Sequence, residues 1–316
     1  MKLPFKFPCQ AVSFLFLSLV FGVATVFAAD GVTNEAHQQF FHGEKVGKEI
    51  LCGCSGRLER FDADGNLVWT YSHEIGNMSD TQLLENGNIL YSDADSIIEV
   101  TPDCKVVFSY IPEDKRNDSA FTATRLEDGN TLIGWNTKNC LIIVNPEGEI
   151  VREIPCQFED APNSHHNMRM VRATKNGTFL VAHKRKGTIA EYDVNGKVLR
   201  TMSVPGKECY GVLELPDGQV LGSFLDALVL FDAEGKETWR CTIDDLAPLS
   251  ISYMCGLQIR QNGNIVVGNY ACNHSKTHTS CMFEITRDKK VVWYYENPNA
   301  PANFMSVLVL EEGTIR

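Results

Sequence analysis

Residues 84–90 read LENGNIL, and this pattern of a polar pair ending in glycine, followed by an apolar run, occurs six times along the chain. The six copies carry Gly87, Gly129, Gly177, Gly218, Gly263 and Gly313, separated by 41 to 50 residues. Asn-Gly and Asp-Gly supply the positive φ that a tight two-residue turn needs, and the flanking residues alternate as half-buried strands do. Each copy is therefore predicted to be a β-hairpin.

A second turn motif interleaves with the first, as in FDADGNLVW at residues 61–69 and YDVNGKVLR at residues 192–200. Two hairpins in about 45 residues give four antiparallel strands per repeat, which is the blade of a β-propeller. No segment between the motifs keeps a 3.6-residue apolar period over the length of a helix. An aromatic side chain in the fourth strand is predicted to pack between blades. It is found at Trp69, Phe108, Trp239 and Trp293.

The two ends of the chain complete one repeat. Residues 48–71 hold three strands without an inner one, whereas FMSVLVLEEG at residues 304–313 is an inner strand with no followers. Joining them removes two free sheet edges. The sequence thus predicts an all-β fold, a six-bladed β-propeller of four-stranded antiparallel blades, with the ring closed by N- and C-terminal strands sharing one blade. The alternative is a seven-bladed parent chain cut at Arg316.

The N-terminus is predicted to be an export signal. Lys2 and Lys6 precede an uncharged run of 17 residues that ends in small residues at Ala28. We therefore expect residues 1–28 to be a cleaved signal peptide, residues 29–47 a lead segment and residues 48–316 a single propeller domain. The protein would be secreted or periplasmic, with no membrane span after cleavage. A membrane anchor is the alternative for this run.

Charge and composition exclude several classes. With 29 Lys and Arg against 40 Asp and Glu, the net charge is -11, so the nucleic acid backbone would be repelled and nucleic acid is not an expected partner. A hydrophobic content of 44% excludes a disordered chain. Removal of Cys9 with the signal leaves ten of the 11 cysteines, an even number that favours disulfides in an oxidising compartment.

One blade stands out for its cationic side chains on the face where the variable loops gather. They come from PNSHHNMR and AHKRKG and are His165, His166, Arg169, His183, Lys184, Arg185 and Lys186. Arg and Lys would hold sulfate, phosphate or carboxylate, and a histidine with an ordinary pKa of about 6.5 could act as nucleophile or acid/base. We expect an anion pocket here, with His183 at a loop tip. A solvated basic loop is the alternative.

The other blades offer unlike residues at the same face. Trp135 aligns with His183, and further side chains are predicted to enter the channel mouth. These are Met78, Asp80, Tyr210, Tyr253, Asn303 and Met305. Of these we take Trp135, Tyr210, Tyr253 and Asn303 as candidate ligand contacts. Because the aligned positions share no chemistry, neither a repeated metal site nor a cofactor is expected.

Two cysteines suggest a cross-link. Cys272 and Cys281 flank NHSKTHTS in one loop, and a disulfide between them would clip a long hairpin shut. A zinc loop with His274 and His278 is the alternative, although the spacing matches no common finger. The connectivity of the other eight cysteines is left open. The absence of a Cys-x-x-Cys-His motif excludes covalent c-type haem.

The paired turn motifs resemble the propeller superfamily of arylsulfotransferase-like and quinoprotein-like repeats over residues 48–316. Its enzymes begin inner strands with histidines, and SHHNMRMVRATKNG at residues 164–177 is similar to that segment. The resemblance implies that His165 or His166 is the nucleophile and Arg169 a sulfate ligand. The other five inner strands begin without histidine, where the family repeats it in several blades.

Two functions from different classes follow. The first, which we favour, is an exported propeller that binds a small anion, a glycan or a protein partner on its loop face without catalysis. The second is an arylsulfotransferase-like group-transfer enzyme, or a lyase, that uses a channel histidine.

Overall fold

Glycine turns shape the blades. All six glycines of the first motif have a positive φ, between 72° and 85°. In the first copy the Leu84 N–H donates to Asn88 O, and the Gly87 N–H donates to Leu84 O, both at 2.9 Å. The predicted hairpins are confirmed, but the predicted two-residue turn is wrong. Three residues join the strands, and in this three-residue turn only the last one, the glycine, needs a positive φ.

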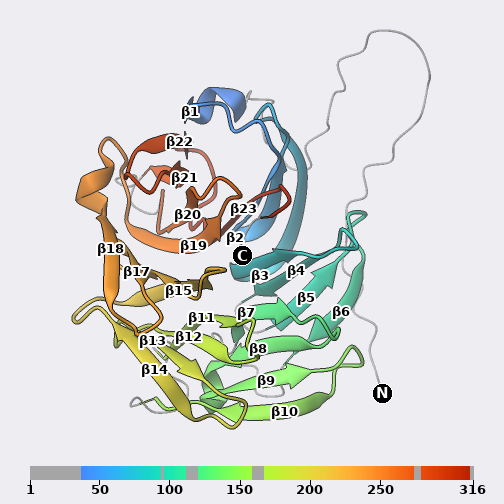
Figure 1. Ribbon diagram of the computed structural model, residues 1–316. Helices are drawn as coiled ribbons and strands as arrows, with labels where there is room; N and C mark the ends of the chain where they lie inside the picture. The colour runs from blue at the N-terminus through green and yellow to red at the C-terminus, as the bar shows by residue number, and fades with distance from the viewer. Residues whose placement is uncertain (1–36, 94–95, 112–119, 159–166, 274–278, 314–316) are drawn as a thin grey trace.

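The computed structural model describes residues 37–93, 96–111, 120–158, 167–273 and 279–313, and it is a ring of six four-stranded antiparallel blades (Figure 1). The predicted fold class is confirmed.

From the channel outward, blade 2 holds the second part of β3 (Leu67–Leu83), then β4 (Ile89–Asp93), β5 (Ser96–Val100) and β6 (Val106–Tyr110). Blade 3 holds β7 (Ala120–Arg125), β8 (Thr131–Trp135), β9 (Cys140–Val144) and β10 (Ile150–Pro155). Blade 4 holds β11 (Met168–Ala173), β12 (Phe179–His183), β13 (Thr188–Tyr192) and β14 (Val198–Ser203). Blade 5 holds β15 (Cys209–Glu214), β16 (Val220–Phe224), β17 (Ala227–Phe231) and β18 (Glu237–Thr242). Blade 6 holds β19 (Tyr253–Ile259), β20 (Ile265–Tyr270), β21 (Ser280–Ile285) and β22 (Val291–Glu296).

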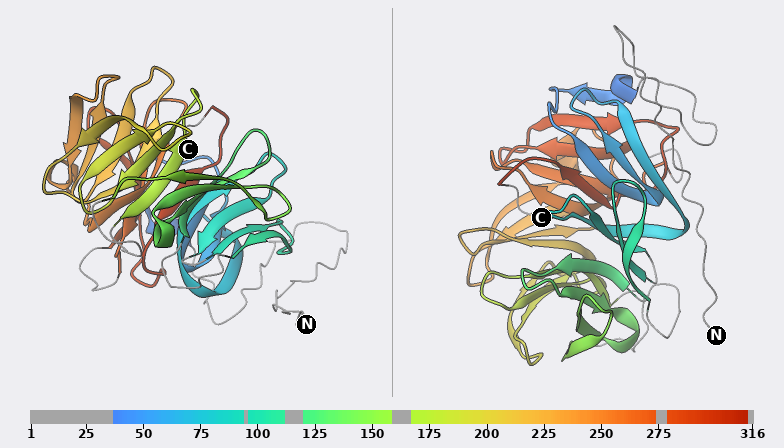
Figure 2. Two further views of the ribbon diagram at one scale, coloured as in Figure 1. Left: turned by 90° about the horizontal axis from the view of Figure 1, so that it is seen from below. Right: turned by 90° about the vertical axis from the view of Figure 1, so that its right-hand side faces the viewer.

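Blade 1 joins the two ends of the described chain. Its inner strand β23 (Ser306–Val309) pairs antiparallel with the start of β2 (Ile50–Phe61), from Ile50 opposite Val309 to Gly53 opposite Ser306. β2 folds back at Gly56, and its second part pairs with the first part of β3. The right-hand view of Figure 2 shows the blue and red strands from the two ends lying side by side. The predicted closure is confirmed.

The lead segment adds a fifth strand to blade 6. The short 3-10 helix η1 (His37–Phe40) leads into β1 (Phe41–Gly43), which pairs with β22, with Phe41 opposite Tyr295. The Phe41 ring packs 4.8 Å from that of Tyr295, so the segment covers an otherwise open edge. The other helices are the 3-10 turns η2 (Asn136–Lys138) and η3 (Ile243–Leu246). Within the described ranges, no helix has the length and apolar character needed to cross a membrane.

Aromatic side chains of the outer strands join neighbouring blades, as predicted. The indole N–H of Trp69 donates to Pro102 O of blade 2 at 3.1 Å. The indole N–H of Trp239 in blade 5 donates to Arg287 O of blade 6 at 2.9 Å. Trp293 is buried and donates to the Glu284 carboxylate within its own blade. The first two contacts tie blade 1 to blade 2 and blade 5 to blade 6.

Candidate functional site

The central channel contains a small cavity. It is lined by Ser79, Asp80, Arg169, Met170, Tyr210, Cys255 and Met305, which come from five blades. The interior is about 20 Å³, enough for about one water molecule. A ligand larger than water would therefore lie over the cavity or displace side chains from it.

Irregular strand pairing supplies most of the cavity wall. Five of the six inner strands show a register shift at their first residues, as between Met168 and Val171 or between Cys209 and Gly211. Arg169 and Tyr210 lie inside these two shifts, and Ser79 and Cys255 lie inside the corresponding ones. A β-bulge re-aims a side chain and is frequent beside functional sites. The repeated bulges therefore turn unlike side chains of different blades toward one point.

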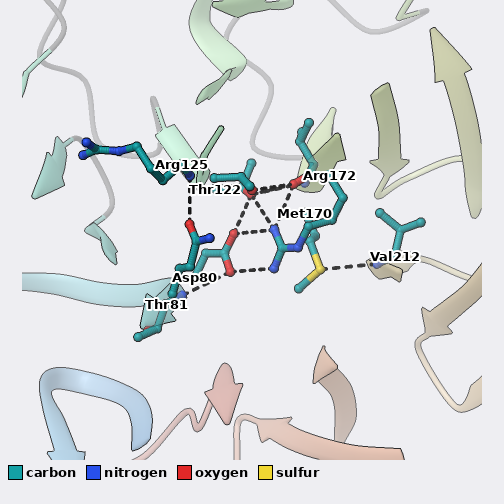
Figure 3. Close-up of polar contacts among 10 residues, drawn as sticks. Asp80, Thr81, Thr122, Arg125, Met170, Arg172 and Val212 are labelled. Atoms are coloured by element: carbon teal, nitrogen blue, oxygen red, sulfur yellow. Dashed lines mark hydrogen bonds and ion pairs between the residues drawn. The ribbon is translucent and has the colours of Figure 1, made fainter. Parts of the chain in front are cut away.

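Asp80 ties three neighbouring blades together beside the cavity (Figure 3). Two nitrogens of Arg172 in blade 4 donate to the two oxygens of the Asp80 carboxylate, at 2.7 and 2.9 Å. Thr122 in blade 3 donates its hydroxyl to the same carboxylate at 2.6 Å. The side chains of Asp80 and Arg172 are only 4% and 11% exposed, so this is a buried bidentate ion pair. The ion pair neutralises the charge of Asp80 and holds the two side chains in one geometry.

Two further cations of blade 4 lie at the same end of the channel. Arg169 and Lys184 are each 7% exposed. Lys184 Nζ lies 3.8 Å from a carboxylate oxygen of Glu208 and 5.7 Å from the centre of the Tyr210 ring. Burial raises the pKa of the Cys255 thiol to about 12, and the charges of Arg169 and Lys184 partly oppose this rise. The field of both cations therefore reaches the cavity.

Cations and carboxylates lie close together at this end of the channel. Arg172 pairs with Asp80, and Lys184 lies beside Glu208. Arg169 lines the cavity itself, within a chain of net charge -11. Buried charges act through a lower dielectric than exposed ones, so an anion at the channel mouth would be attracted by these cations.

A row of tyrosines continues the wall through blades 5 and 6. The Tyr210 and Tyr253 ring centres are 5.8 Å apart, and those of Tyr253 and Tyr270 are 5.6 Å apart. Tyr210 is buried and donates its hydroxyl to the Glu208 carboxylate, while Tyr253 and Tyr270 are half-buried. The row therefore offers aromatic surface next to the cations.

The predicted site residues separate into three groups. Arg169 and Tyr210 line the cavity, as do Asp80 and Met305, and Lys184 and Tyr253 contact this wall. Arg185 is exposed on the loop after β12. His165 and His166 lie outside the described residues.

Trp135 and Asn303 have contacts of a structural kind. Trp135 is buried, packs against Tyr110 with ring centres 6.4 Å apart, and lies under Lys138 Nζ. Asn303 accepts a hydrogen bond from the Ala271 N–H and donates one to the Ser55 hydroxyl, both at 2.9 Å. The amide thus joins blades 1 and 6, and neither side chain is among those that line the cavity.

His183 is not the exposed cation that the sequence predicted. It is the last residue of β12, only 4% exposed, and its Nε2 lies 3.0 Å from the Tyr192 hydroxyl. The ring packs between Phe158 and Tyr192. Burial, helped by the charge of Lys186, lowers the pKa of His183 to about 3. The imidazole is therefore neutral at physiological pH and offers no positive charge to an anion.

This burial predicts a dependence of stability on pH. Because the pKa of His183 is about 3 in the folded state and about 6.5 when unfolded, the unfolded chain binds one more proton between these pH values. The contribution to the free energy of unfolding is complete above about pH 6.5 and falls by about 1.4 kcal/mol per pH unit below it. Urea unfolding of His183→Gln should show a shallower loss between about pH 6.5 and 5. Parallel curves for the variant and the wild type would contradict the assignment.

The ion pair of Arg172 with Asp80 was missed from the sequence, as were three cavity residues, Ser79, Met170 and Cys255. The signal of these three residues was their place at the start of an inner strand. Simple alternation of side chains would have assigned some of them to the wrong face, because the bulges shift the pattern by one residue.

No model of a known protein family matches the sequence, and no curated protein matches it. A protein of unknown function from Bacteroides caccae is 20% identical, with a TM-score of 0.73 over 83% of this chain and 98% of that one. A streptogramin B lyase is 12% identical, with a TM-score of 0.57 over 83% and 90% of the two chains. The WD40 propeller domain of Doa1 is 16% identical, with a TM-score of 0.55 over 70% and 72%. Identities this low show the fold alone, so the chain shares the propeller fold with these proteins, and the arylsulfotransferase-like assignment is not confirmed.

Proposed function

We propose that this protein binds a small anionic ligand over the channel mouth and leaves it chemically unchanged. The observation that carries the proposal is the pair of buried cations, Arg169 and Lys184, beside a cavity in an acidic chain. Hydrogen bonds from Arg or Lys to carboxylate, sulfate or phosphate are about twice as strong as those between neutral groups. The bulge that contains Arg169 presents its side chain to the cavity. We also propose that residues 1–28 act as an export signal, so that the ligand is bound outside the cytoplasm.

The size of the cavity favours the smallest of the possible partners. An anionic group can sit at the mouth without displacing the ion pair of Asp80 and Arg172, which fills the neighbouring wall. An acidic glycan or an acidic protein segment would use the same cations and would stack on Tyr253 and Tyr270. A free inorganic anion is therefore the simplest probe of the site.

Removal of the Arg169 charge should weaken anion binding. We expect Arg169→Met to lower the affinity for inorganic sulfate or phosphate by about tenfold or more, since a hydrogen bond to a charged group contributes about 1.5–3 kcal/mol. Isothermal titration calorimetry of the two proteins would measure this loss. The matched control is Arg185→Met, because Arg185 is exposed on the same loop face and should matter little. Equal losses in both variants would contradict a site at the channel mouth, as would no binding by the wild type.

The alternative, a group-transfer or lyase enzyme, rests on the resemblance of residues 164–177 to histidine-bearing strands. Streptogramin B lyase shares only the fold with this chain, so it does not decide the matter. Hydrolysis or transfer of aryl sulfate esters by the wild type and by His166→Ala separates the two functions. Turnover that is lost in the variant would favour the enzyme, whereas no turnover across a panel of esters would favour the binding protein.

A further inference from the structure

Two buried thiols lie where blade 6 meets the closing blade. Cys272 follows β20 and Cys281 lies in β21, and neither is exposed. Each thiol affects the pKa of the other, and the side chain of Asn273, next to Cys272, donates to Cys281 Sγ at 3.5 Å. Both belong to one apolar cluster with Phe304 and Val307, which lead into and form the closing strand. The loop of blade 6 and the closing segment therefore meet at this pair of sulfurs.

The two sulfurs have unequal surroundings. The Cys281 thiol, together with backbone N–H groups of Phe304 and Asn303, lowers the pKa of the Cys272 thiol. The Cys272 side chain and burial raise the pKa of Cys281, whose Sγ donates to Thr279 O at 3.4 Å. Of the two sulfurs, Cys272 therefore loses its proton more readily, and Cys281 less readily. The thiolate is the nucleophile in disulfide exchange.

We infer that Cys272 and Cys281 form a disulfide by exchange with a small disulfide such as oxidised glutathione, with Cys272 as the attacking sulfur. The Cys272 thiolate attacks one sulfur of the small disulfide, whose S–S bond breaks and releases one thiolate. That thiolate takes the proton of Cys281, and the Cys281 thiolate then attacks Cys272 Sγ and displaces the second small thiolate, which takes a proton from water. The chain loses two electrons, and the small disulfide is reduced to two thiols.

The cross-link would act on the joint that closes the ring. Asn273, next to Cys272, donates its side-chain N–H to Asn297 O at 2.9 Å and to Ala300 O at 3.3 Å. Asn303 accepts from the Ala271 N–H at 2.9 Å. The loop that carries Cys272 is therefore fastened to the segment leading into β23. A disulfide here would also restrict the unfolded chain, which stabilises the folded one.

The test maps the thiols of the full chain. Protein unfolded in reductant is refolded in glutathione buffers from reducing to oxidising, so that glutathione reaches sulfurs that the folded chain buries, and is then alkylated, digested and analysed by mass spectrometry. We expect the Cys272–Cys281 disulfide to form in buffers that leave Cys140 and Cys156 as thiols. Cys140 and Cys156 are the matched control, because their sulfurs are close enough to interact. The residue opposite Cys140 in the sheet is Pro155, so the side chain of Cys156 lies on the other face of the sheet and the two sulfurs are not placed to bond. The oxidised protein should also have the higher Tm.

Two variants test the roles of the sulfurs. Cys281→Ser should trap glutathione on Cys272 as a mixed disulfide, whereas Cys272→Ser should leave Cys281 unmodified. The inference is overturned if both residues remain thiols in the most oxidising buffer, if bound zinc protects them, or if the adduct appears on Cys281 instead. The mapping of the wild type does not depend on whether either variant folds.

Discussion

Asp80→Ala should lower the free energy of unfolding by about 3–5 kcal/mol, the usual cost of breaking a buried ion pair on one side. The change leaves the Arg172 guanidinium, whose side chain is 11% exposed, without the carboxylate that receives two of its hydrogen bonds. It also removes the nearer of two acceptors of the Thr122 hydroxyl, the other being Val171 O at 3.4 Å. Because these side chains come from blades 2, 3 and 4, three blades lose a common tie.

A double variant separates the charge from the packing. In Asp80→Leu with Arg172→Met no charge is left unpaired, so most of the lost stability should return. Urea unfolding followed by circular dichroism measures both proteins. Asp103→Ala is the control, because Asp103 pairs with Lys105 on the surface and its loss should have little effect. A loss for Asp80→Ala no larger than that of the control would show that the ion pair does not hold the blades together.

The ring could be predicted from the sequence because its signals are local. Each Gly turn needs a positive φ at one residue, and the repeated spacing then gives the number of blades. The turn keeps its shape in the two copies of the second motif that lack glycine, because Cys104 and Lys289 take the glycine position with a φ of 64°. The missing inner strand at one end and the surplus strand at the other predicted the closure, because joining them completes one blade and leaves neither strand edge unpaired.

The site was less predictable because it depends on register and burial rather than on motifs. His183 looks like an exposed loop residue in AHKRKG, yet one strand pair and two aromatic rings bury it. Arg169 and Tyr210, which the sequence singled out, line the cavity, but Arg172 was not singled out. Its partner Asp80 is 92 residues away, and no local pattern reports a contact across the channel.

The closing strand should be indispensable to the fold. Phe304, Val307 and Val309 are all buried, and burial of each such side chain contributes about 1.5–3 kcal/mol. The closing segment also packs directly against two glycines of blade 6. A Cβ added to Gly256 would lie 2.4 Å from Met305 O, and one added to Gly268 would lie 2.4 Å from Phe304 O. Removing it therefore costs an amount comparable with the whole stability of a typical domain, about 5–15 kcal/mol.

A chain that ends at Ala302 tests this directly. We expect it to lose its cooperative thermal transition in calorimetry and to expose the edge of β2 that pairs with β23. A synthetic peptide of residues 303–313 should restore the transition, since it can add the missing strand to that edge. The same peptide with Leu308→Pro should fail, because Leu308 lies opposite Leu51 and alternates in the ladder with Leu310, whose N–H donates to Glu49 O at 2.8 Å, and proline has no N–H to donate. Unaltered melting of the shortened chain would show that five blades hold the ring without the shared one.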